Sequence, residues 1–201
     1  MVKVAIFDYG AGNIFSLKSS LEKNNAQVDV ITNLDKIDGY SGLLLPGVGN
    51  FDPAIKSLNT SKVAFQDLAK NQVPVLGICL GMEMFFEKSE EGKLNGLGVL
   101  EGEVVILPNK FKIPHMGWND LQVKKTSVLL EGVKEGSWVY FVHSYRVKPK
   151  NEDIVKADSD YGISVPAVIE NGNLFGTQFH PEKSGKIGAQ MIKNFLRTCK
   201  K

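Results

Sequence analysis

The 201-residue sequence contains few of the residues that mark several large protein classes. It has only two cysteines, Cys79 and Cys199, which lie far apart in the chain, so a disulfide framework is not expected. Its three histidines are dispersed without the spacing of zinc ligands. We therefore expect neither a bound metal nor a cofactor.

An excess of one charge and long hydrophobic runs are also missing. The formal net charge is +2, and no dense Lys/Arg stretch with interleaved aromatic residues is present, so a nucleic-acid partner is not expected. The apolar run that ends at Asp8 is too short for a signal peptide or a membrane span. These absences favour a cytoplasmic protein without a membrane partner.

The composition itself, 43% hydrophobic and 23% charged, suits a globular protein with a sizeable core. No internal repeat, low-complexity segment or linker interrupts the chain. The sequence therefore predicts a single domain over residues 1–201.

Short apolar runs alternate with segments of helical period in the first half of the chain. The expected strands are Val2–Phe7, Val28–Ile31, Gly42–Leu45 and Val75–Cys79, and the expected helices are residues 14–21, Asp52–Leu58 and Val63–Lys70. This alternation is typical of an α/β fold with a mostly parallel central sheet and helices on both faces.

From about Gly98 the pattern changes to alternating strands, such as "LEGEVVIL" and "WVYFVHSY", which predict an antiparallel extension. Loops are expected around Pro108–Trp118 and Pro149–Asp153. Asn171-Gly172 predicts a hairpin turn, followed by a strand over Asn173–Phe179 and a helix after Ser184.

The stretch "VLGICLGM", residues 75–82, places Cys79 between Gly77 and Gly81. A strand that runs straight into a helix turns sharply, and the G-x-S-x-G elbow uses glycines at this spacing to relieve crowding. Here sulfur stands in place of oxygen, and the N–H of Leu80 would point toward an anion forming beside the thiol. The alternative is that Cys79 is a small buried hydrophobic residue.

The segment "FHPE" provides a possible activating pair for this thiol. His180 and Glu182 lie two residues apart at the end of the predicted strand, where residues i and i+2 share a face, and a carboxylate that orients an imidazole can make a thiol nucleophilic. The alternative is a solvated surface pair. His143, after a strand, and His115, in the expected loop, are rival bases, but neither has an acidic residue at the equivalent spacing.

The segment "LLLPGVGNF", residues 43–51, follows a strand and flanks Val48 with Gly47 and Gly49. These glycines let the peptide plane rotate, so this segment can supply a second N–H to an oxyanion hole. The alternative is an ordinary loop. The spacing of a phosphate-binding loop or a dinucleotide fingerprint is absent from the sequence.

Together these motifs resemble the class I (triad) glutamine amidotransferases, whose Cys, His and Glu hydrolyse the amide of glutamine. The further motifs "DYGAGNIFSL", "LPGVGNFDPAI", "IPHMGWN", "YFVHSYR" and "HPEKSGKIG" extend the resemblance to the glutaminase subunits of imidazole glycerol phosphate synthases, over almost the whole chain. The resemblance implies a flavodoxin-like α/β fold.

The resemblance also implies a role for each matching residue. Cys79 would be the nucleophile, His180 the base and then the acid, and Glu182 the group that orients His180. The oxyanion hole would be formed by Leu80, Val48 and Gly49. The residues that contact glutamine would be Gly49, Glu83, Glu91, Ser144 and Tyr145. The residues of the partner interface would be Asn13, His115, Trp118, Tyr140 and Lys183.

Glu83 departs from the superfamily pattern, which commonly has glutamine there, although a carboxylate can still accept from the α-ammonium of the substrate. Glu91 has an alternative reading as part of a solvated charge run.

The implied substrate is L-glutamine, and the implied partner is a (β/α)₈-barrel cyclase that forms a heterodimer with the glutaminase. The cyclase receives ammonia and makes imidazole glycerol phosphate and aminoimidazole carboxamide ribonucleotide in histidine biosynthesis. Three alternatives remain open: a glutaminase that serves a different synthase, a cysteine peptidase on a similar fold, and a non-catalytic subunit that only docks.

Overall fold

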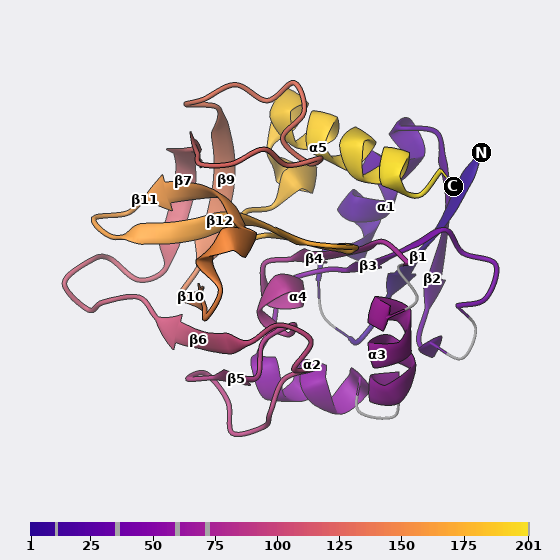
Figure 1. The fold of residues 1–201 in the computed structure, drawn as a ribbon, viewed down its shortest axis with the longest axis horizontal. Coiled ribbons are helices and arrows are strands. Elements are labelled where there is room, and N and C mark those ends of the chain that lie inside the picture. The colour runs from indigo at the N-terminus through magenta and orange to yellow at the C-terminus, as the bar shows by residue number, and fades with distance from the viewer. Residues whose placement is uncertain (11, 35–36, 59–60, 71–72, 201) are drawn as a thin grey trace.

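The computed structural model describes residues 1–10, 12–34, 37–58, 61–70 and 73–200 (Figure 1). Its main sheet has eight strands in the order β2-β1-β3-β4-β13-β12-β11-β8. The strands are β1 Val2–Phe7, β2 Ala26–Ile31, β3 Gly42–Leu45, β4 Val75–Ile78, β8 Gln122–Val123, β11 Val155–Asp160, β12 Ser164–Asn171 and β13 Leu174–Thr177. Neighbours from β2 to β13 run parallel, and the remaining pairs are antiparallel.

Helices cover both faces of this sheet, as the sequence predicts (Figure 1). The helices are α1 Ile14–Lys23, α2 Phe51–Leu58, α3 Lys62–Lys70, α4 Leu80–Glu83 and α5 Gly185–Thr198, with short 3₁₀ turns η3 Glu152–Ile154 and η4 Pro181–Lys183. Alternate residues of β1 point to opposite faces, so Ile6 packs with the helices α1 and α5 while Phe7 packs with α2 and α3. The two apolar clusters therefore hold the sheet from both sides.

The extension that the sequence predicts after Gly98 comprises the antiparallel strands β8, β11 and β12 of the main sheet and most of two smaller sheets. One has the order β10-β6-β5, and the other pairs β7 with β9. Their strands are β5 Lys88–Ser89, β6 Gly102–Ile106, β7 His115–Asp120, β9 Trp138–His143 and β10 Tyr145–Pro149.

Two sequence predictions in this region are wrong. Residues 115–118 belong to β7 rather than to a loop, because antiparallel pairing with β9 places His115 opposite His143. The strand predicted over Asn173–Phe179 is β13, which ends at Thr177, and the backbone N–H of His180 instead donates to Tyr140 O at 2.9 Å. The chain therefore leaves the main sheet before it reaches His180.

No helix among the described residues is both long enough and apolar enough to cross a membrane.

Candidate active site

Cys79 lies in the sharp turn between β4 and α4, with a φ of 50°, in the left-handed region that non-glycine residues rarely adopt. The flanking glycines make this turn possible. A Cβ on Gly81 would lie 2.1 Å from Leu45 O, and one on Gly77 would lie 2.6 Å from Gly81 O. The crowding that the sequence predicts is therefore present, and burial of a small apolar side chain does not by itself account for the unusual backbone.

A cavity of about 330 Å³ opens beside the sulfur. Burial raises the pKa of the Cys79 thiol well above its usual range, and the charge of Glu83 raises it further. The N–H of Leu80 and the side chain of Gln178 oppose this shift. The thiol is therefore protonated at neutral pH, and it requires a base to become a nucleophile.

His180 lies at the same edge of the main sheet as Cys79. Strands β13 and β4 are parallel neighbours with Thr177 opposite Ile78, and the N–H of Cys79 donates to Thr177 O at 2.6 Å. The charge of Glu182 also contributes to the raised pKa of the Cys79 thiol. The elbow and the His-Glu pair thus meet on one side of the molecule.

The expected pairing of His180 with Glu182 is present, but a strand does not produce it. His180 Nδ1 lies 2.8 Å from Glu182 Oε1, and both side chains are buried. Pro181 begins the turn η4, so the carboxylate curls back to the imidazole. Because Nδ1–H donates to the carboxylate, the lone pair lies on Nε2, which is buried without a hydrogen-bond partner in the described part of the chain.

His143 has no lone pair available for the sulfur. Its Nδ1 lies 2.7 Å from the carbonyl oxygen of Tyr145, which can only accept, so this nitrogen carries the proton. Its Nε2 lies 2.9 Å from His115 Nδ1 and accepts from it. Burial lowers the pKa of His143 to about 3 and that of His115 to about 4, so both are neutral. This geometry favours His180 over both rival bases.

The segment after β3 packs against the elbow. A Cβ on Gly47 would lie 1.6 Å from Ile78 O, so only glycine fits. Gly49 has a φ of 127°, and together with Val48 and Leu80 it lines the cavity. The segment is therefore placed where the sequence analysis expects the second N–H of an oxyanion hole.

The two carboxylates expected to contact substrate both line the cavity. Glu83 is buried and accepts from Gln178 Nε2 at 3.0 Å, and burial raises its pKa to about 8. Glu91 is half-buried and accepts from the N–H of Phe51 at 3.1 Å, at the start of α2. Glu91 therefore has a specific contact and is not simply part of a solvated charge run.

Ser144 and Tyr145 also line the cavity, at the point where β9 passes into β10.

Sequence reasoning missed Gln178 and Tyr9. Gln178 is fully buried, and its Nε2 donates to both Glu83 and the sulfur of Cys79, at 3.0 and 3.7 Å. The hydroxyl of Tyr9 is buried without a partner in the described residues, and burial raises its pKa, with further contributions from Cys79 and Glu83. The sequence does contain a signal for Gln178, because it is a polar residue that directly follows an apolar strand.

Four of the five expected interface residues are accessible at least in part. Trp118 is 52% exposed and meets Tyr140 edge to face at 5.9 Å, and the ammonium of Lys183 lies 6.0 Å from the Tyr140 ring. Asn13 is exposed at the start of α1. His115 is the exception: it is 3% exposed because it stacks between two aromatic rings, so it offers little surface to a partner.

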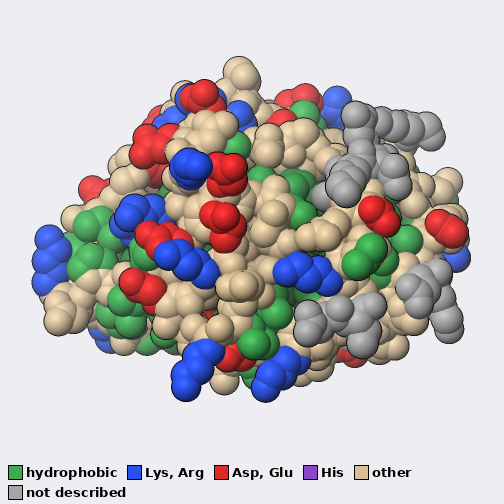
Figure 2. All heavy atoms as spheres, turned by 60° about the horizontal axis from the view of Figure 1, so that its bottom comes forward, with side chains coloured by type: hydrophobic (Ala, Val, Ile, Leu, Met, Phe, Trp, Pro, Cys, Tyr) green, Lys and Arg blue, Asp and Glu red, His purple; other side chains and the backbone are tan. Residues whose placement is uncertain are grey.

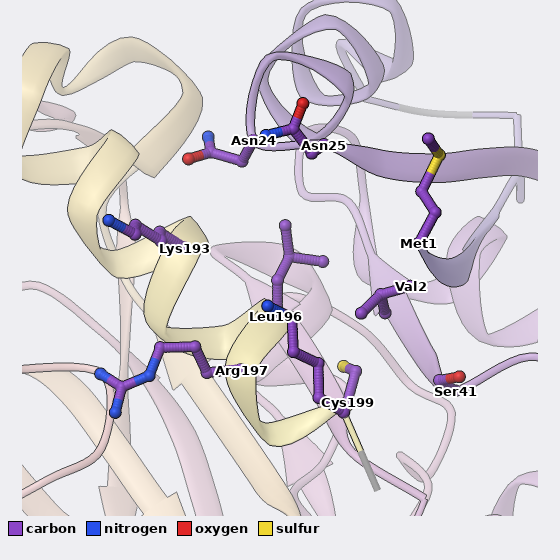
Figure 3. Close-up of a pocket in the computed structure, with 10 residues that line it drawn as sticks. Met1, Val2, Asn24, Asn25, Ser41, Lys193, Leu196, Arg197 and Cys199 are labelled. Atoms are coloured by element: carbon purple, nitrogen blue, oxygen red, sulfur yellow. The ribbon is translucent and has the colours of Figure 1, made fainter.

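A larger cleft, of about 700 Å³, lies at another edge of the molecule, between the end of α5 and the start of β1 (Figure 3). Cys199 lines it, and burial raises the pKa of this thiol to about 12, so Cys199 is a poor nucleophile.

On the face drawn in Figure 2, basic and acidic side chains are interspersed. Among the described residues, no group of three or more His, Cys, Asp or Glu side chains could hold a metal ion.

Comparison with known proteins relates this geometry to a family. Residues 5–199 match the model of the class-I glutamine amidotransferases. The imidazole glycerol phosphate synthase subunit HisH of Geobacillus kaustophilus is 45% identical over 202 residues, covering 96% of this chain and 95% of the relative. The subunit of the same name from Bacillus anthracis is 47% identical over 195 residues, with coverage of 96% and 93%.

A solved structure shares the fold at low sequence identity. A glutamine amidotransferase from Thermotoga maritima superposes with a TM-score of 0.74 at 15% identity, covering 100% of this chain and 99% of that one. The chain therefore belongs to the class-I glutamine amidotransferases and, within them, to the family of HisH subunits of imidazole glycerol phosphate synthase.

Proposed function

We propose that this chain is the glutaminase subunit of an imidazole glycerol phosphate synthase and that Cys79, His180 and Glu182 hydrolyse L-glutamine to glutamate and ammonia. One observation carries the assignment of the triad. A cysteine on a strained elbow faces a cavity, and at the same sheet edge a carboxylate-oriented imidazole keeps a buried, unpartnered Nε2. A thiol of raised pKa requires such a base to become a nucleophile.

The reaction follows from the position of each proton. His180 Nε2 takes the thiol proton as the sulfur attacks the side-chain carbonyl of glutamine. The resulting oxyanion accepts from the Leu80 N–H and, after a peptide rotation, from an N–H of residues 47–49. His180 then returns the proton to the departing ammonia, and it activates a water that hydrolyses the thioester to glutamate.

Glu182 supports both proton transfers. Its carboxylate holds the imidazole with the Nδ1 proton facing away from the sulfur, and it stabilises the imidazolium that forms during each transfer. The pair is buried, so this interaction is stronger than it would be at the surface.

The cavity suits a small zwitterion. Glu83 and Glu91 can receive the α-ammonium of glutamine, while the main chain at Ser144 and Tyr145 receives its α-carboxylate. A carboxyl of pKa about 8 is largely protonated at neutral pH, and a bound ammonium favours its ionised form. Glu83 can therefore take the place of the glutamine that is common at this position.

The docking face that we propose is formed by the β7 and β9 edge together with the neighbouring helix starts. It contains Asn13, Trp118, Tyr140 and Lys183. Large aromatic side chains are frequent anchors of protein interfaces. The partner would be a (β/α)₈-barrel cyclase that takes up the released ammonia and forms a heterodimer with this chain.

A labelling and activity experiment tests the proposal. The chain, mixed with a cyclase subunit and its nucleotide ligand, should release glutamate from glutamine, and Cys79→Ala should abolish this release. A glutamine-mimicking electrophile should attach to Cys79 only. Cys199→Ala is the matched control, because Cys199 is the other cysteine and lies outside the cavity. Full activity without Cys79 would refute the mechanism.

The same experiment separates the alternative functions. A non-catalytic docking subunit would neither react with the electrophile nor release glutamate, although it would still bind the cyclase. A glutaminase of a different synthase would show its full activity only with another partner, so exchanging the synthase subunit distinguishes it. A panel of amide substrates distinguishes a peptidase.

A further inference from the structure

The two histidines that are not in the proposed triad form a hydrogen-bonded chain with a fixed direction. His143 Nδ1–H donates to Tyr145 O at 2.7 Å, which leaves Nε2 as the acceptor of His115 Nδ1–H at 2.9 Å. His115 Nε2 then carries a lone pair, and it lies 3.4 Å from Asn119 Nδ2, which can donate. The carbonyl at one end therefore determines the tautomer of both rings.

Packing holds both rings in place. His115 stacks on Tyr161 at 4.0 Å and on Phe141 at 4.7 Å between ring centroids. The two histidines are 3% and 4% exposed, and their lowered pKa values keep them uncharged at neutral pH. Rings that are buried, neutral and stacked cannot rotate freely, so the chain of bonds has one stable arrangement.

This chain joins two regions that matter for the proposed function. His115 begins β7, which also carries Trp118, 52% exposed and part of the proposed docking face. At the other end, Tyr145 lines the glutamine cavity, and its carbonyl oxygen is the last acceptor. Pro114, directly before His115, lines the same cavity.

We propose that His115 and His143 are positioning residues that fix the main chain at Ser144 and Tyr145 for the α-carboxylate of glutamine. They act through the carbonyl of Tyr145 and not on the sulfur of Cys79. Their hydrogen bonds connect the main chain at Tyr145 to β7, the strand that carries Trp118 of the proposed docking face. The inference rests on the proposed glutaminase function, because it assigns these residues to the binding of that substrate. It predicts a defect in substrate affinity, whereas loss of the base His180 predicts a defect in turnover.

Nitrogen NMR of the intact chain tests the arrangement without an activity assay. The protein has three histidines, so single substitutions assign every imidazole signal. Near pH 7, His115 and His143 should both be neutral with the proton on Nδ1. His115→Phe preserves an aromatic ring in the stack but removes the donor to His143, so the signal of His143 Nε2 should shift. A proton on Nε2 of His143 in the unaltered chain would overturn the proposal.

Steady-state kinetics in the presence of the cyclase test the consequence. His143→Leu removes both hydrogen bonds and should raise the KM for glutamine about tenfold or more, with a smaller change in kcat. His143→Asn keeps a donor near the Nδ1 position and should recover most of this loss. Tyr161→Phe, which touches the same His115 ring but lies outside the hydrogen-bonded chain, is the control.

The possible outcomes distinguish this inference from the proposed function. If the unaltered protein did not hydrolyse glutamine, both would be refuted. If it did so and His143→Leu left KM unchanged, or if His143→Asn behaved like His143→Leu, only the positioning role would be overturned. A fall in kcat at constant KM would also overturn it.

Discussion

Glu83→Gln should remove a strong pH dependence from the stability of this protein. The folded carboxyl has a pKa of about 8, against an ordinary value of 4.5, because it is buried; the hydrogen bond from Gln178 opposes this shift and the charge of Glu91 adds to it. Between these pH values the folded chain holds a proton that the unfolded chain has already lost. Stability therefore falls as the pH rises through this window, and above it both states are ionised.

The size of this loss follows from the two pKa values. Between about pH 5 and about pH 8.5, the free energy of unfolding should fall by about 4 kcal/mol through Glu83 alone. A glutamine at this position cannot ionise, yet its amide oxygen can still accept from Gln178 Nε2. The variant should therefore gain about 4 kcal/mol over the unaltered protein across the same interval.

Urea denaturation of both proteins at several pH values measures this difference directly. The same change at Glu152, an exposed position, is the control for the substitution itself. Parallel stability curves for the unaltered protein and Glu83→Gln would refute the argument, because they would mean that Glu83 is ionised at neutral pH despite its burial.

Two further predictions concern the triad and the docking face. Glu182→Gln keeps an acceptor for His180 but removes the charge that stabilises the imidazolium. We therefore expect kcat to fall at least about a hundredfold while the KM for glutamine changes little. Steady-state kinetics with the cyclase measure both constants, and an unchanged kcat would contradict the role of Glu182. Trp118→Ala should weaken binding of the cyclase by about thirtyfold, measured by titration calorimetry. Val63→Ala, which alters an exposed apolar residue on α3, is the control, and equal affinity of both variants would exclude Trp118 as an anchor.

The sequence predicted the parallel half of the fold well because its signals are local. Buried parallel strands give continuous apolar runs such as Gly42–Leu45, and the hairpin that Asn171-Gly172 predicts joins β12 to β13, with its turn one residue later, at Gly172 and Asn173. Strand β7 was missed because it is only partly buried and because its partner β9 lies farther along the chain. Pairing of this kind depends on tertiary contacts and leaves little trace in local periodicity.

The candidate site, like the fold, has one part that the local sequence predicts and another part that depends on tertiary contacts. The spacing of Gly77, Cys79 and Gly81 already indicated a crowded elbow, because the turn from strand to helix is set by a few consecutive residues. The sequence also placed His180 beside Glu182, although it attributed the contact to a strand instead of a turn. Motif spacing alone therefore predicted the class of reaction, in which an activated cysteine acts as the nucleophile.

Only the tertiary structure decided which histidine can serve the sulfur. All three are buried, and sequence distance does not reveal their partners. The lone pair of His143 is used by His115, which comes from another strand, whereas that of His180 remains unpartnered among the described residues. Proton positions depend on the acceptors that folding brings to each ring, and these come from segments far apart in the chain.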